Sequence, residues 1–177
     1  VPDGADAQRL VRRNPGTSLT WGSAGFSNMQ NAITTAFGGT GNITALSSIA
    51  NLGDLAGSTA LFLDLGALGA GGALSLQEQA TLTQYIASGR RVFFLGENDA
   101  WAAWNNSFLA VVGGSANPTL VTGPITRVGT HPITTGVNTV TVTGGIAAIG
   151  GTALFAPNVG TLWGTQQNVF SFLDYNA

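Results

Sequence analysis

A chain of 177 residues falls within the size range of a single domain and is long enough to bury one hydrophobic core. Only 8% of its residues are charged, all six cations are arginines, and the formal net charge is −2, which excludes nucleic acid as the main partner. The absence of cysteine excludes disulfides, thiolate metal sites and a cysteine nucleophile. No apolar run reaches the roughly 20 residues of a membrane helix, so no membrane span is predicted.

Along the chain, residues 1–17 are expected to be a polar lead-in and residues 18–21 a short strand. Apolar side chains then recur at the spacing of one helical face, at Phe26, Met29, Ile33 and Phe37. Ser27 and Gln30 have the spacing of a capping box, and residues 38–39 are two glycines that would end the helix. A second strand is predicted at residues 42–46.

The next segment predicts strand, helix and strand. Residues 60–65 are almost continuously apolar, which is typical of a strand covered on both faces. After a glycine-rich connection at residues 66–72, Ser75 and Glu78 form a capping box for a helix that ends at Gly89. Residues 91–95 follow at once and are predicted to be a buried central strand. This order predicts a parallel pair joined by a right-handed crossover.

The second half of the chain is expected to be rich in strands. One more helix is predicted at residues 101–112, and short β-type runs follow at residues 120–122, 140–142, 153–156 and 169–173. The fold class that this pattern indicates is α/β, a three-layer flavodoxin-like domain with a mainly parallel sheet and a strand-rich C-terminal part. With no linker visible, residues 1–177 are expected to form one domain.

Several segments together resemble the class I glutamine amidotransferase-like fold, a group that includes trehalose-utilisation-like domains. They are the residues 60–64 (ALFLD), 76–89 (LQEQATLTQYIASG), 91–96 (RVFFLG), 104–106 (WNN), 130–137 (THPITTGV) and 168–176 (NVFSFLDYN). The resemblance covers about residues 60–177 and implies a flavodoxin-like fold. Catalytic members carry a cysteine elbow where this chain has residues 96–99 (GEND), and the late catalytic His-x-Glu is also absent. The resemblance therefore implies a scaffold without amidotransferase activity, because that chemistry depends on the thiolate.

In open parallel sheets, ligands bind at the carboxyl ends of the strands. This rule selects seven candidate ligand-binding residues: Ser23, Asp64, Glu97, Asn98, Asp99, Trp101 and Trp104. The carboxylates could hold Ca²⁺ or Mg²⁺ or supply a general acid. The favoured alternative is that Asp99 caps the helix that begins near Trp101 and that Glu97 faces solvent. No calcium-loop spacing is present, so no metal or cofactor is predicted. The two tryptophans could stack on a sugar or form the inner face of a helix.

Other catalytic constellations find little support in the sequence. His131 is the one histidine, and it precedes a proline in a turn, which favours a structural role over that of a base. The stretch around Ser23, residues 22–25 (GSAG), is not a Gly-x-Ser-x-Gly nucleophile elbow, which requires glycines two residues on either side of the serine. The glycine clusters match neither a dinucleotide-binding nor a phosphate-binding motif. No catalytic residue is predicted.

The sequence thus favours a non-enzymatic structural or interaction module. A chain rich in Thr, Asn and Gly without Cys or Lys is typical of an extracellular or cell-surface protein, exported with its signal peptide removed. Its weakly charged surface favours assembly with copies of itself into an oligomer or filament. The alternative is a carbohydrate-binding protein or a glycan-directed hydrolase, which would use the acids near Glu97 and Asp99 and bind a polysaccharide.

Overall fold

The computed structural model describes residues 8–14, 21–22, 24–65, 72–96, 99–113, 116–127, 136, 139–149, 152–157 and 170–172. The chain divides into two compact units, Val1–Leu95 and Gly96–Ala177, and each is described by itself. The expectation that the whole chain forms one domain stays a prediction.

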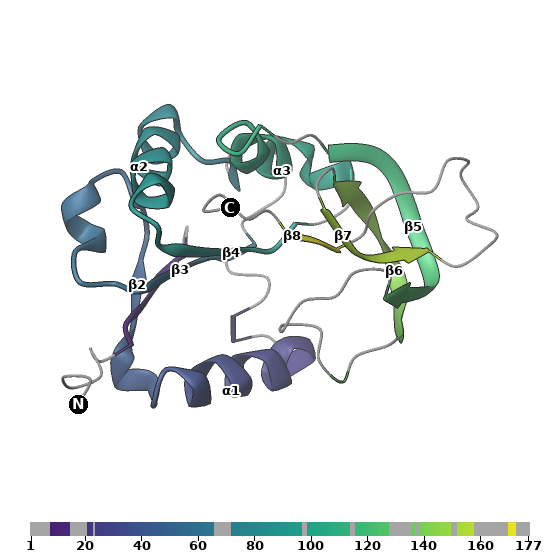
Figure 1. The fold of residues 1–177 in the computed structure, drawn as a ribbon, viewed down its shortest axis with the longest axis horizontal. Coiled ribbons are helices and arrows are strands. Elements are labelled where there is room, and N and C mark those ends of the chain that lie inside the picture. The colour runs from purple at the N-terminus through teal and green to yellow at the C-terminus, as the bar shows by residue number, and fades with distance from the viewer. Residues whose placement is uncertain are drawn as a thin grey trace. The chain divides into compact units, whose positions relative to one another are not determined.

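The first unit is a parallel sheet between helices (Figure 1). Its strands are β1 (Leu10–Arg13), β2 (Ile43–Leu46), β3 (Ala60–Leu63) and β4 (Arg91–Phe94), and their order across the sheet is β2-β1-β3-β4. Helix α1 (Ser27–Ala36) covers one face, and α2 (Leu76–Ala87) covers the other. This strand order is that of flavodoxin-like sheets, so the predicted three-layer α/β class is confirmed.

Short 3-10 helices connect these elements. They are η1 (Ala24–Phe26), η2 (Thr40–Asn42) and η3 (Leu52–Leu55) in the first unit and η5 (Asp99–Trp101) in the second.

The alternation of side chains along the strands divides the core between the two faces. Leu10, Ala60 and Phe62 form one cluster, which packs against Trp21, Met29, Ile33, Phe37 and Ile43. The odd-numbered residues Val11, Leu61 and Leu63 point to the face covered by α2, and all three are buried. Of the predicted helical face, Met29, Ile33 and Phe37 pack on the cluster of Leu10, Ala60 and Phe62, whereas Phe26 belongs to the preceding η1.

Local capping signals succeeded for one helix and failed for the other. In α2, the Ser75 side chain accepts a hydrogen bond from the Glu78 amide, and the Glu78 carboxylate accepts one from the Ser75 amide, as predicted. In α1, the N-cap residue is Phe26, and no side-chain cap bond is present, so the predicted capping box of Ser27 and Gln30 is wrong. Gln30 instead accepts a hydrogen bond from the amide of Gly22 at 3.0 Å, which takes its side chain away from the cap.

Two strand predictions need correction. Strand β1 lies inside the segment that was expected to be a polar lead-in. The strand predicted at residues 18–21 is not tested at residues 18–20, which lie outside the described residues, and its last residue, Trp21, lies in a turn. Strand β4 forms where it was predicted, but it lies at the edge of the described sheet, not at its centre. Arg91 and Phe93 are exposed, with Phe93 43% accessible, as expected for a strand with a neighbour on one side only.

The second unit combines one helix with an antiparallel sheet. Helix α3 (Ala102–Leu109) contacts β5 (Ala116–Arg127) and has Trp104, Phe108 and Leu109 buried. The sheet order is β6-β5-β7-β8, with β6 (Thr139–Ile149), β7 (Thr152–Pro157) and β8 (Phe170–Phe172). Each predicted C-terminal run overlaps one of these strands, so the strand-rich C-terminal part is confirmed. Across the described residues, none of the helices is long and apolar enough to cross a membrane.

Candidate functional site

The candidate site lies at the carboxyl ends of β1 and β3. In a sheet with this strand order, the chain leaves β1 toward β2 on one side, while β3 lies on the other side, so a crevice is expected between them. The register pairs Arg12 with Phe62 and Arg13 with Leu63, and Asp64 follows β3 directly. Three charged residues therefore lie at the strand ends where this kind of sheet binds its ligands, with Arg12 and Asp64 on one face and Arg13 on the other.

On the α1 face, Arg12 and Asp64 form a buried ion pair. The Arg12 Nη1 atom lies 2.5 Å from Asp64 Oδ2, and the two side chains are 10% and 0% exposed. The Arg12 guanidinium also stacks over the Trp21 ring, 4.9 Å from its centroid. Trp21 in turn contacts Phe62 edge to face, with 5.7 Å between the ring centroids. The Asp64 carboxylate is thus paired with a guanidinium group at the strand ends.

On the α2 face, Arg13 and Glu78 form a second buried pair with two parallel bonds. Arg13 donates from Nε to Glu78 Oε1 at 2.8 Å and from Nη2 to Oε2 at 3.1 Å. The remaining donors reach the carbonyl oxygens of Gly72 at 3.2 Å and Ala73 at 3.4 Å. This two-pronged geometry is one that a guanidinium offers and an ammonium does not.

The Glu78 carboxylate joins α2 to β1 and to the segment after β2. Besides Arg13 of β1, it accepts hydrogen bonds from the amide of Ile49 at 3.2 Å, after β2, and from the amide of Ser75 at 3.0 Å. Burial acts to raise the pKa of Glu78, but the hydrogen bonds from Arg13, Ser75 and Ile49 and the Arg13 charge outweigh it, so the pKa is lowered. Glu78 is therefore held as a carboxylate.

This arrangement limits the chemistry available at the strand ends. A general acid needs a raised pKa, whereas the pKa of Glu78 is lowered. A metal ligand needs free oxygen atoms, and both carboxylates already bind guanidinium groups. Among the described residues, no three His, Cys, Asp or Glu side chains gather in a way that could hold a metal ion. The strand ends are organised to hold the sheet and its helices together.

The seven residues predicted from sequence have different outcomes. Asp64 lies at the carboxyl edge as expected. Ser23, Glu97 and Asn98 lie outside the described residues, as does His131. Asp99 and Trp101 belong to η5 of the second unit, and Trp101 is half-buried. Trp104 is completely buried in α3, which agrees with the core alternative rather than with sugar stacking.

Sequence reasoning missed Arg12, Arg13 and the pairing role of Glu78. A signal was present, because two adjacent arginines directly follow the apolar Leu10 and Val11 in a chain with 8% charged residues. Buried arginines need carboxylate partners, so this pair could have prompted a search for two buried acids.

Comparison with known proteins supports the fold and goes no further. No family model and no curated protein matches the chain. A solved structure titled "mmIFT52 N-terminal domain" is similar, with a TM-score of 0.60 and 15% sequence identity over 84% of this chain and 72% of that one. At this identity the likeness shows a shared fold alone. The resemblance to the amidotransferase-like group stays a prediction.

Proposed function

We propose that this chain is a non-enzymatic interaction module that acts outside the cell and assembles with copies of itself. The observation that supports this most directly is the position of Asp64. It lies at the point where such sheets bind ligands, yet its side chain is 0% exposed and bonded to Arg12. The position that would hold a reactive carboxylate is occupied by a structural ion pair.

The composition supports the assembly part of the proposal. With 8% charged residues and a net charge of −2, copies of the chain repel one another weakly. The amidotransferase-like resemblance fits the same proposal, since a chain without cysteine has lost the nucleophile of that group. Such a scaffold can still present surfaces for contact.

Sedimentation velocity across a wide range of protein concentration tests the assembly. We expect the weight-average sedimentation coefficient to rise with concentration. A monomer at every concentration and ionic strength would contradict the proposal.

A hydrolase assay tests the non-enzymatic part. Ester, amide and glycoside substrates are incubated with the wild-type chain and with Asp64→Asn, and no turnover is expected from either. Turnover by the wild type that is lost in Asp64→Asn would show that the carboxylate is reactive and would overturn this part of the proposal.

A further inference from the structure

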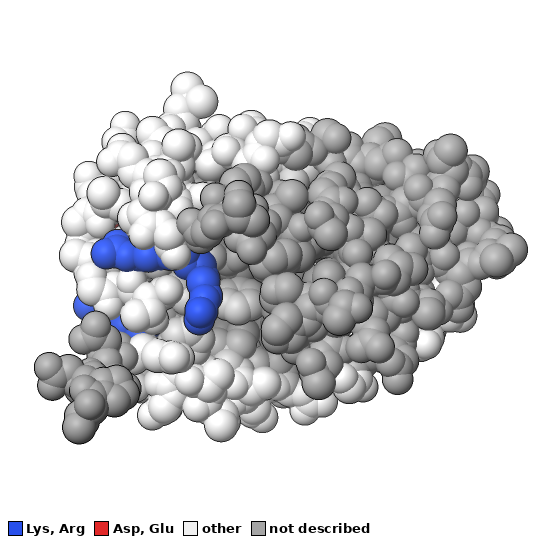
Figure 2. Space-filling model, viewed as in Figure 1, with Lys and Arg blue, Asp and Glu red and all other residues white. Residues whose placement is uncertain are grey.

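Helix α1 presents an exposed face that has no charged side chain. The exposed side chains of the helix are all uncharged and short: Ser27, Asn28, Asn31, Ala32, Thr35 and Ala36. Asn28, Asn31, Ala32 and Thr35 follow the i, i+3, i+4, i+7 spacing of one helical face. The uncharged segment extends well beyond the helix, because no Asp, Glu, Lys or Arg occurs from residue 14 to residue 53. In Figure 2, the described surface along α1, at the lower edge of the view, shows neither blue nor red atoms.

The same helix has little support from its own sequence or from the rest of its unit. Five of its ten residues are Ser, Asn or Thr, which are weak helix formers. It has no side-chain cap, no acidic residue in its first turn and no basic residue in its last turn. None of its side chains is fully buried, and those that face the sheet are half-buried. A helix of this length is marginal in water unless packing stabilises it.

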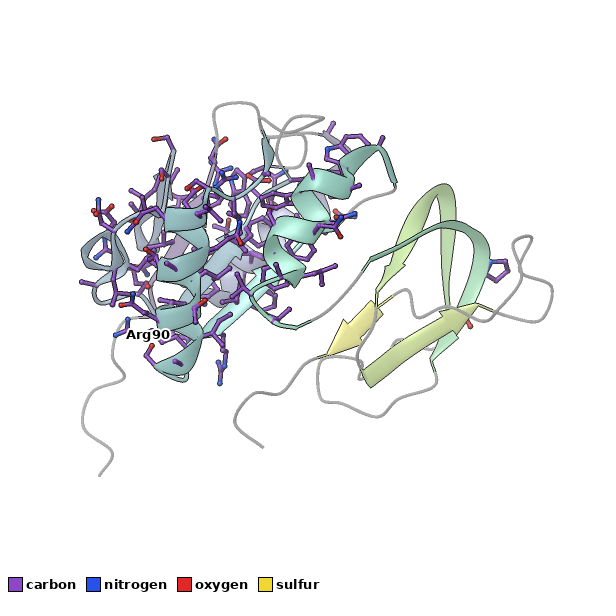
Figure 3. All side chains as sticks on the ribbon, turned by 90° about the horizontal axis from the view of Figure 1, so that it is seen from above. Arg90 is labelled. Carbon is purple, nitrogen blue, oxygen red and sulfur yellow. The ribbon has the colours of Figure 1, made fainter. Side chains whose placement is uncertain are left out.

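Helix α2 has the support that α1 lacks. It begins with the capping box of Ser75 and Glu78, and the side chains of Glu78, Leu82 and Tyr85 are buried. At its end, Arg90 stacks over the Tyr85 ring, 5.4 Å from its centroid (Figure 3). The two helices cover opposite faces of the same sheet, so the difference lies in the helices themselves. Of the two, α1 has more to gain from a contact on its outer face.

We propose that the exposed face of α1, defined by Asn28, Asn31, Ala32 and Thr35, is the surface through which two copies of this chain bind each other. This inference rests on the proposed self-assembly and adds its contact surface. A contact across a two-fold axis places the same surface on both sides, so the surface has to be complementary to itself.

The chemistry of this face favours a second copy over a charged partner. Amide and hydroxyl groups of Asn and Thr both donate and accept hydrogen bonds, so the face can pair with an identical one. Carboxylates only accept and guanidinium groups only donate, and a partner rich in them would bury charges against groups that have no counter-charge. Short side chains also let two helices approach to about 8–10 Å and lose little conformational freedom on burial.

The first test compares the same substitution on the two helices. Ala32→Arg places a charge in the middle of the α1 face and should weaken association by more than about 100-fold, because that charge would be buried without a partner. Ala80→Arg makes the matched change at an exposed position of α2 and should assemble as the wild type does. Arginine and alanine are both strong helix formers, so both variants should keep their helices, which circular dichroism checks.

The variant Asn28→Glu separates the contact from the stability of the helix. A carboxylate in the first turn interacts favourably with the helix dipole, so this variant should be at least as stable as the wild type in urea. Its charge lies on the exposed face, so association should nevertheless weaken by more than about tenfold. A variant that keeps its stability and associates as tightly as the wild type would contradict the proposal.

Sedimentation velocity measures the association, and hydrogen exchange locates it. As the concentration of the wild type rises, the amides of α1 should become more protected, while those of α2 stay unchanged. Because the contact contains no charges, assembly should persist from about 50 mM to about 1 M NaCl. Assembly that added salt abolishes would contradict an uncharged contact.

The outcomes separate the two proposals. If Ala32→Arg and Asn28→Glu both assemble as the wild type does, α1 is not the contact, and the proposed self-assembly stands without it. A wild type that never assembles overturns both proposals. If monomeric wild type gains protection in α1 when dextran is added, the face binds a neutral polysaccharide, and the proposal of a second copy is wrong.

Discussion

Replacing Glu78 with glutamine tests whether the buried ion pair at the carboxyl edge of the sheet stabilises the fold. The side chains of Arg13 and Glu78 are 5% and 4% exposed, and Glu78 accepts hydrogen bonds from Arg13, Ile49 and Ser75. Glutamine keeps the shape but leaves a buried guanidinium without a counter-charge and turns an amide group toward its donors. Breaking a buried pair in this way costs about 3–5 kcal/mol. With a urea m-value of about 2 kcal/mol/M, the unfolding midpoint should fall by roughly 1.5–2.5 M.

Two controls make this measurement specific. Asp54→Asn removes an exposed carboxylate of the same unit and should change the free energy of unfolding by less than about 0.5 kcal/mol. Arg13→Met/Glu78→Leu removes both charges together, and its cost should be well below that of Glu78→Gln, since a buried pair can be replaced by apolar side chains at little cost. A loss of less than about 1 kcal/mol for Glu78→Gln would refute the reasoning, because the pair would then not be desolvated.

Three further predictions concern acidity, capping and the buried tyrosine. Because the pKa of Glu78 is lowered on folding, its contribution to the free energy of unfolding is fully present above the unfolded pKa of about 4.3 and is lost as the pH falls through the folded pKa. Urea unfolding below pH ~5 should therefore show a steeper loss of stability for the wild type than for Arg13→Met/Glu78→Leu. Ser75→Ala removes one half of the α2 capping box and should lower the free energy of unfolding by about 1 kcal/mol in the same assay, whereas an unchanged midpoint would mean that the cap bond contributes nothing. Burial raises the pKa of Tyr85 despite its hydrogen bond to Ser58 and the nearby Arg90 charge, so the phenolate absorbance that disappears in Tyr85→Phe should titrate above the ordinary tyrosine pKa of about 10.

Signals within a short stretch of sequence were sufficient to predict most helices and strands of the first unit. The helical spacing of Phe26 to Phe37, the reciprocal cap of Ser75 and Glu78, and the apolar run of β3 each depend on neighbours a few residues away. Such interactions form in the same way in many tertiary settings, so α1, α2 and β3 could be predicted. The candidate site was predicted in part for the same reason, because Asp64 follows an identifiable strand, although its partner was not foreseen.

The tertiary structure alone decided the features that depend on distant partners. The four residues of β1 include two arginines, and they can lie at the centre of the sheet only because Asp64 and Glu78, which are 52 and 65 residues away, neutralise them. Gln30 has the spacing of a cap but bonds to Gly22 instead. The composition of β4 does not indicate an edge position, because that position depends on which strands lie beside it. Local sequence encodes which elements form, whereas burial and long-range pairing decide where a charged strand can lie and whether a carboxylate is free to react.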